Sequence, residues 1–470
     1  MKLKRLLAIL FALSLVAAAC GSDDDGDDTA ADDASESESA SASASASEPA
    51  DDDDGGSEDD SSGGGELATD FGVTDTQIFV GMNADLSGPF ASLVAEIVES
   101  QKVYWEWVND NGGIAGREVV PVILDSGYAT DKGIENYEEL AQESEDGVLM
   151  ISENTGSPIT AAIAEQAEED DMLVIPLSWA SLWPDFPNVL GKQTTYCIEA
   201  MNGVSWLADK VTELGGEPSL AILSRPGEYG LDGATGAALA AEALGVPIVY
   251  DGTDQVAGDD RTAVISQLVD SEATMVWTTL TPGELLDIFG NAVSQGFDAQ
   301  WSGNSPSFNY LVHMPSDFAA EFDEFYWQAG YQEVWTFEPQ SEGAQDMVRE
   351  MTARRPELNL SDVYVSGWLE GIIVQTILEQ AAANGDMTRA GVVEAASQVE
   401  IDFKGLAPNQ SFFGEYNDIV VRESYMFDVR ADEFNIQPMS AGEGSTGIFV
   451  EEGPFVADVT ANFEFDGACI

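Results

Sequence analysis

Short apolar runs alternate along the chain with longer stretches in which apolar residues recur every three or four positions. A run of roughly four to eight apolar residues favours a buried strand, and the longer spacing favours an amphipathic helix. The first series of predicted strands is 77–81, 119–124, 148–151 and 172–176, with helices at 91–108, 136–145 and 159–169. A second series has strands at 219–223, 247–250 and 275–277 and helices at 204–214, 232–244 and 262–270.

Strands that alternate with helices in this way predict βαβ units and parallel sheets covered on both faces. We therefore expect an α/β fold with two doubly wound, Rossmann-like lobes. A further helix is predicted over 363–383, and short aromatic runs within 410–429 are typical of closing strands. In open parallel sheets the loops at the carboxyl ends of the strands form the binding crevice, so two facing lobes predict a cleft that closes by hinge bending.

The N-terminus has the layout of a secretory signal. Three positive charges precede the apolar run 6–16, and three alanines lead into Cys20. This arrangement resembles the lipobox of bacterial lipoproteins, which implies that residues 1–19 are removed and that Cys20 is lipidated. A transmembrane anchor is the weaker alternative, because the apolar run is too short to span a bilayer comfortably.

Residues 21–65 contain only Gly, Ser, Ala, Asp, Glu, Thr and one Pro, so this segment has no side chain that can build a core. We interpret residues 20–70 as a disordered acidic tether. Its like charges repel one another and extend it, which suits a spacer between a membrane and a folded body.

The whole chain carries 17 basic and 86 acidic residues, a formal net charge of -69. Without the 17 acids of the tether and the three bases of the signal, 14 bases and 69 acids remain, a charge of -55. A body this acidic excludes nucleic acid as an ordinary partner. A cationic ligand is one interpretation of the charge; adaptation to a saline or halophilic habitat is the other, and the scarcity of lysine fits it.

Three cysteines leave Cys197 and Cys469 once Cys20 is lipidated. They could pair in an oxidising compartment, but a count of two says nothing about the distance between them, so the pairing stays open.

Several segments together resemble the branched-chain amino-acid-binding family of type 1 periplasmic solute-binding proteins. They are Val80-Gly-Met-Asn-Ala-Asp-Leu-Ser-Gly-Pro-Phe-Ala91, Val108-Asn-Asp-Asn-Gly-Gly-Ile-Ala-Gly-Arg117, 148–161 and Val174-Ile-Pro-Leu-Ser178. The resemblance covers most of 77–427. It implies two lobes joined by a three-strand hinge, an N-terminal lobe at 71–197 and 330–398, and a C-terminal lobe at 198–329 and 399–470.

The same resemblance implies capture of an amino acid or related small solute for an ABC permease, without a cofactor. By position, the ligand-binding residues of the family correspond to Thr155, Gly156 and Ser157 and to Ser178, Trp179 and Ala180. The residues support the first group independently: Ser157 is a good N-cap, Pro158 suits a first helical turn, and free helix amides can hold a carboxylate. An ordinary capped helix without a ligand is the alternative.

The second lobe is expected to contribute an aromatic residue, and Tyr229 occupies that position, with a packing tyrosine as the alternative. Leu93 stands where amino-acid binders often place a tyrosine, and the acid that neutralises a ligand amine falls near Gly258, next to Asp259 and Asp260. These departures allow amides, urea or aromatic acids as ligands. Trp179 and Trp183 could stack on a planar or hydrophobic substrate, or serve packing alone.

An enzyme needs a set of catalytic side chains, and we find no motif for one in the sequence. The single histidine, His313, has no partner motif for a triad or a metal site, and carboxylate pairs are expected by chance among 86 acids. A lipoprotein that signals ligand to a membrane receptor remains open, because transport and sensing use the same closing lobes. An adhesive surface lipoprotein fits the predicted cleft less well.

Overall fold

The computed structural model describes residues 67–258 and 260–470. The predicted signal, Cys20 and most of the predicted tether lie outside these residues. The tether prediction extends too far at its end: β1 (Ala68–Thr69) pairs with β11 (Asp386–Met387), and the Arg389 amide donates to the Asp70 carboxylate. Within the described residues no helix is long and apolar enough to cross a membrane.

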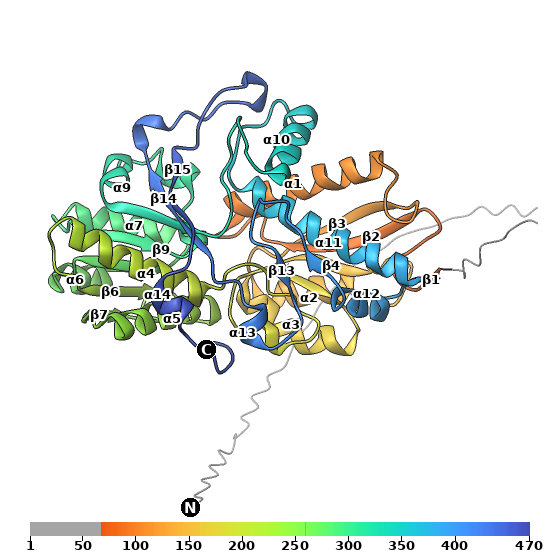
Figure 1. Cartoon of the computed structure of the whole chain (residues 1–470), viewed down its shortest axis with the longest axis horizontal. Helices are drawn as coiled ribbons and strands as arrows, with labels where there is room; N and C mark the ends of the chain where they lie inside the picture. Colours follow the sequence, from red (N-terminus) through yellow and green to blue (C-terminus); the bar gives the residue numbers. More distant parts are fainter. Residues whose placement is uncertain (1–66, 259) are drawn as a thin grey trace, which may run out of the picture. The chain divides into compact units, whose positions relative to one another are not determined.

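The first lobe is built on a four-stranded parallel sheet in the order β3-β2-β4-β5. Its strands are β2 (Gln77–Ala84), β3 (Glu118–Asp125), β4 (Met150–Thr155) and β5 (Val174–Leu177). Its helices are α1 (Ala91–Asp110), α2 (Thr130–Leu140), α3 (Ser157–Glu169), α10 (Glu342–Arg354), α11 (Tyr364–Asn384) and α12 (Arg389–Ala396). α1 packs against α11 and α2 against α3, so both faces of the sheet are covered, as expected for a doubly wound fold (Figure 1).

The second lobe has a seven-stranded sheet in the order β15-β14-β10-β9-β8-β6-β7. The parallel strands are β6 (Leu220–Ser224), β7 (Ile248–Gly252), β8 (Met275–Thr279), β9 (Gln300–Gly303) and β10 (Tyr326–Gly330). β14 (Ser424–Val429) and β15 (Ile448–Phe455) are antiparallel additions at one edge. The helices are α4 (Tyr196–Glu213), α5 (Glu228–Leu244), α6 (Thr262–Asp270), α7 (Pro282–Val293), α8 (Tyr310–His313), α9 (Ala319–Phe325), α13 (Tyr416–Ile419) and α14 (Asp458–Ala461).

The chain passes between the sheets three times, after β5, after β10 and before β14. The first and third crossings meet at a parallel bridge between Thr194 and Val421. The predicted lobe boundaries differ from the packing at the third crossing: we expected 399 onward in the second lobe, but Phe403, Leu406 and Phe412 belong to the core of the first. The short β12 (Glu400–Ile401) and β13 (Gln410–Ser411) hairpin holds this segment there, so the exact boundaries stay a prediction.

Two helices begin earlier than their apolar spacing indicated. α2 was expected over 136–145, and α4 was expected from residue 204. The Thr195 hydroxyl caps α4 by accepting the Ile198 amide. Gly203 weakens the helical pattern of this segment in the sequence. A glycine is required at this position, because a β-carbon would lie 2.2 Å from the Trp277 ring.

Cys197, near the start of α4, forms a disulfide with Cys469, with 6.4 Å between their α-carbons. The pairing that the sequence left open is therefore present. It ties the C-terminal end of the chain to the second lobe.

Candidate functional site

A cavity lies at the carboxyl ends of the strands, where the two lobes face each other. It holds about 900 Å³ of empty space, including its opening to solvent. Most of the lining is aromatic or aliphatic: Phe90, Leu93, Val94, Ile97, Tyr128, Leu177, Trp179, Tyr196, Tyr229, Pro306, Phe308, Tyr331, Val334, Val363 and Phe427. Its polar lining comes from Thr155, Ser157, Ser305, Gln328, Gln332, Glu333, Asp362 and Ser366.

The N-terminus of α3 forms one end of the cavity. Gly156 precedes the helix with φ +102°, and a β-carbon there would lie 2.5 Å from the Tyr128 ring, so only glycine fits. The helix ladder begins with the Thr160 amide, which donates to the Gly156 carbonyl. The amides of Ser157 and Ile159 precede that bond and can donate to an anion.

Thr155 and Ser157 both line the cavity, but their hydroxyls differ. Thr155 donates to Glu153 Oε1 at 2.8 Å and accepts the Asp85 amide at 3.3 Å, so this hydroxyl is held by protein groups. The Oγ atoms of Ser157 and Ser178 lie 2.6 Å apart. Burial, and then repulsion from Glu370, raise the pKa of Glu153 to about 8.

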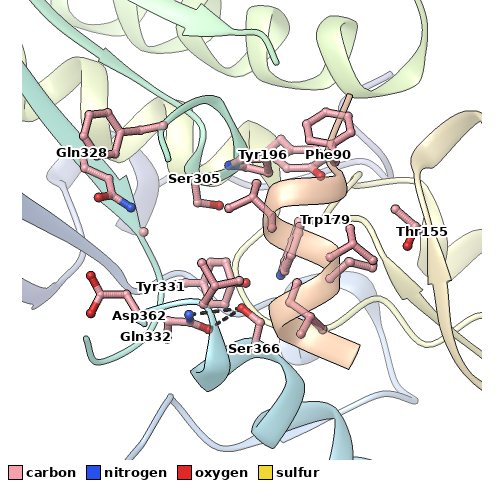
Figure 2. A pocket seen from close by; sticks show the side chains of 18 of the residues that line it. Phe90, Thr155, Trp179, Tyr196, Ser305, Gln328, Tyr331, Gln332, Asp362 and Ser366 are labelled. Atoms are coloured by element: carbon pink, nitrogen blue, oxygen red, sulfur yellow. Dashed lines mark hydrogen bonds between the residues drawn. The ribbon is translucent and has the colours of Figure 1, made fainter. Parts of the chain in front are cut away.

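The three predicted ligand contacts at 178–180 lie in different surroundings in the structure. Ser178 is fully buried and reaches the site only through Ser157, and Ala180 lines a separate, smaller cavity. Trp179 lines the main cavity between Thr155 and Tyr331 (Figure 2). Its ring lies 5.1 Å from the Tyr331 ring and 4.8 Å from Lys192 Nζ, and its indole nitrogen has no hydrogen-bond partner.

The ring of Tyr229 lines the cavity, while its hydroxyl bonds to the protein. The hydroxyl donates to the Leu280 carbonyl at 2.9 Å, and the ring lies 4.7 Å from Tyr196 and 6.2 Å from Phe90. The two interpretations of this residue, ligand contact and packing, are therefore compatible. Trp183, in contrast, is fully buried away from the cavity and donates to the Ser178 carbonyl.

Of the region expected to neutralise a ligand amine, Gly258 and Asp260 do not line the cavity. Gly258 and Asp260 are exposed, and Asp259 lies outside the described residues. Among the described residues, the acids that line the cavity are Glu333 and Asp362, and Figure 2 shows Asp362 on the side opposite Thr155. Burial raises the pKa of both, that of Asp362 to about 7, which favours their neutral forms.

Sequence reasoning missed most of the lining. No local sequence motif marks the other lining residues, which come from the face of α1, Tyr128, Tyr196, the 305–308 turn and the segments 328–334 and 362–366. The α1 face was visible only as ordinary amphipathic spacing. Residues 328–334 form the end of β10 and the segment directly after it, and we did not predict this strand.

His313 is buried, and its ring nitrogens bond to the backbone of Asn309 and Pro282. Burial lowers its pKa to about 4. Over 67–258 and 260–470, no group of three His, Cys, Asp or Glu side chains is arranged to hold a metal ion.

Comparison with known proteins supports the resemblance. A family model described as periplasmic binding protein matches residues 77–433, while no curated protein sequence matches. The fatty acid ABC transporter substrate-binding protein from Thermomonospora curvata is 26% identical with a TM-score of 0.74, over 84% of this chain and 97% of that one.

A branched chain amino acid ABC transporter protein from Thermus thermophilus with bound valine has a TM-score of 0.65 at 16% identity, over 83% of this chain and 98% of that one. At that identity the likeness shows the fold alone. Since the family model covers most of the chain and the lobes have the expected construction, this chain belongs to the periplasmic binding protein family, with the type 1 fold.

Proposed function

We propose that this protein captures a carboxylic acid with an extended apolar body and delivers it to an ABC importer. The observation that carries the proposal is the composition of the cavity, which is lined mainly by aromatic and aliphatic side chains and has free helix amides at one end. Those amides favour a carboxylate, and the apolar walls favour a hydrocarbon chain or ring.

The cavity fits such a ligand better than a small zwitterion. A ligand ammonium close to its own carboxylate would need an anionic partner near α3, whereas Asp362 lies on the side of the cavity opposite Thr155 (Figure 2). The description of the Thermomonospora curvata protein as a fatty acid binder supports the same ligand class.

An amino acid is the second candidate. Glu333 and Asp362 line the cavity and could receive a distant amine when ionised. The valine-bound protein from Thermus thermophilus shares the fold. This candidate requires one of two conditions. Either the amine and the carboxylate of the ligand are far enough apart to reach opposite sides of the cavity, or the two acids move towards α3 when the lobes close.

The location follows from the N-terminal sequence. We place the protein on the extracytoplasmic face of the cell membrane, anchored through lipidated Cys20, with an ABC permease as its partner. A disulfide between Cys197 and Cys469 supports an oxidising compartment. Cys20→Ala should release the protein from the membrane fraction; retention there would contradict the anchor.

The ligand class can be tested by thermal melting of the purified full chain with straight-chain and aromatic acids, aliphatic amino acids, amides and urea. A ligand at a hundred times its dissociation constant adds about 2.7 kcal/mol of stability. Large shifts with octanoate and longer acids support the proposal. A shift with leucine or valine and none with the acids overturns it in favour of the second candidate.

A further inference from the structure

A second, smaller cavity lies beside the first and third crossings between the lobes. It holds about 430 Å³ of empty space, including its opening to solvent. Trp179 lines both cavities, and therefore stands between the main site and this one. The rest of its lining includes Lys192 and Gln193 from the first crossing and Gln410 and Phe412 from the third.

Gln193 is the most unusual of these residues. The residue is 2% exposed, yet neither its Nε2 nor its Oε1 has a hydrogen-bond partner. Leaving a buried polar group unpaired costs about 1–3 kcal/mol. Gln410 does not relieve this, because its Oε1 accepts the Gln193 backbone amide at 2.7 Å and its Nε2 donates to the Gly191 carbonyl at 3.0 Å.

The indole N–H of Trp179, which lines both cavities, is a further unpaired donor, and this residue is 6% exposed. A molecule that pairs the Gln193 side chain must accept from Nε2 and donate to Oε1. A primary amide or urea group carries an acceptor and a donor in one plane and meets this requirement.

The charge of the site favours a neutral molecule. Lys192 Nζ donates to Glu370 Oε1 and to the Pro176 carbonyl, both at 2.7 Å, and all of this ion pair is buried. Because its charge is already compensated by Glu370, Lys192 provides little attraction for an anion. The planar rings of Trp179 and Phe412 suit a small amide with a short apolar group.

We propose that this hinge cavity is a second binding site, for a small neutral amide- or urea-type molecule. Such a molecule bonds to the first crossing at Gln193, next to Gln410 of the third. It therefore favours the arrangement of the crossings described here, and it contacts the wall of the main cavity through Trp179. The site does not depend on which ligand the main cavity takes.

The test follows the indole N–H signals of full chain labelled with ¹⁵N-tryptophan, with that of Trp179 identified by its loss in Trp179→Phe. Acetamide is the probe, and acetone, which accepts but cannot donate, is the matched control. We expect acetamide to shift the Trp179 signal saturably and acetone to have at least about tenfold weaker effect, a difference of about 1.4 kcal/mol.

Gln193→Leu removes the amide at similar size, and Gln193→Gly removes it while relieving the positive φ of +53° at this residue. Both should abolish the acetamide response, and Gln328→Leu, the same change in the main cavity, should retain it. Saturating octanoate should leave the response in place.

Three outcomes overturn the proposal. An absent or unsaturable acetamide shift in the wild type means that ordered water alone satisfies Gln193. Equal responses to acetamide and acetone mean that no amide-specific site exists, a comparison that needs no variant. A response lost in Gln328→Leu but kept in the Gln193 variants places the amide in the main cavity.

Discussion

The hydroxyl oxygens of Ser157 and Ser178 lie 2.6 Å apart, which joins the start of α3 to the end of β5. Each hydroxyl restrains the other, so Ser157 is held at the cavity wall beside the free amides of its helix. This pair explains how Ser178, which is fully buried, contributes to a site that it does not touch.

Ser157→Ala should weaken octanoate binding by at least about tenfold, because a hydrogen bond from this hydroxyl to the carboxylate contributes roughly 1.5–3 kcal/mol. Titration calorimetry measures the change. Ser152→Ala is the matched control: Ser152 lies in β4, donates to the Gly81 carbonyl at 3.1 Å and does not line the cavity. Equal affinities of the wild type and Ser157→Ala for octanoate would show that the Ser157 hydroxyl does not bind the ligand.

The protein should be more stable at mildly acidic pH than at alkaline pH. Burial raises the pKa of five carboxyl groups, to about 7 for Glu96, Glu199, Asp232 and Asp362 and to about 8 for Glu153. The folded state therefore holds protons that the unfolded state releases above about pH 4.5, and their contribution to stability is lost as the pH rises towards 8.

Chemical unfolding at a series of pH values measures this dependence, and Glu199→Gln should reduce its slope between about pH 4.5 and 7. His313 acts in the opposite direction, because its lowered pKa costs stability as the pH falls from 6.5 towards 4. A stability that rises steadily from pH 5 to pH 8 would show that these carboxyls are ionised in the folded protein.

Salt should raise both the melting temperature and the affinity for a carboxylate. The body carries -55 by its sequence, so salt screens repulsion among its surface acids and between the body and an incoming anion. A cationic ligand should instead bind more weakly as salt increases. Melting curves and octanoate titrations from low to molar salt test both effects; a melting temperature that does not respond would contradict the proposed salt adaptation.

The sequence was sufficient to predict the lobes because buried apolar runs mark several strands, among them 148–151 at the start of β4 and 220–223 in β6. It was less informative after residue 280. The start of α7 could have been found, because Thr281 and Glu284 form a capping box that is legible in the sequence. β9 and β10 have only four and five residues and mix polar with aromatic side chains, so they give no clear period.

The site could be predicted only where a local motif marks it. Gly156, Ser157 and Pro158 signal a helix start, and Gly156 and Ser157 line the cavity. The expected N-cap was wrong by one residue: Gly156 is the N-cap, Ser157 is the first residue of α3, and no side chain caps the helix. Phe90, Tyr331 and Asp362 meet there through the crossings of the chain, and no local spacing encodes that proximity. For the same reason the smaller cavity beside Gln193 was not foreseen, since it depends on the contact between the first and third crossings.

The most direct test of the ligand proposal is a calorimetric titration of the full chain with octanoate and with leucine under the same conditions. We predict that octanoate binds at least about tenfold more tightly and with a negative heat-capacity change, because its apolar chain is buried against the cavity walls. Tighter binding of leucine than of octanoate would contradict this account and make the acids at 333 and 362 the partners of an amino acid's amine.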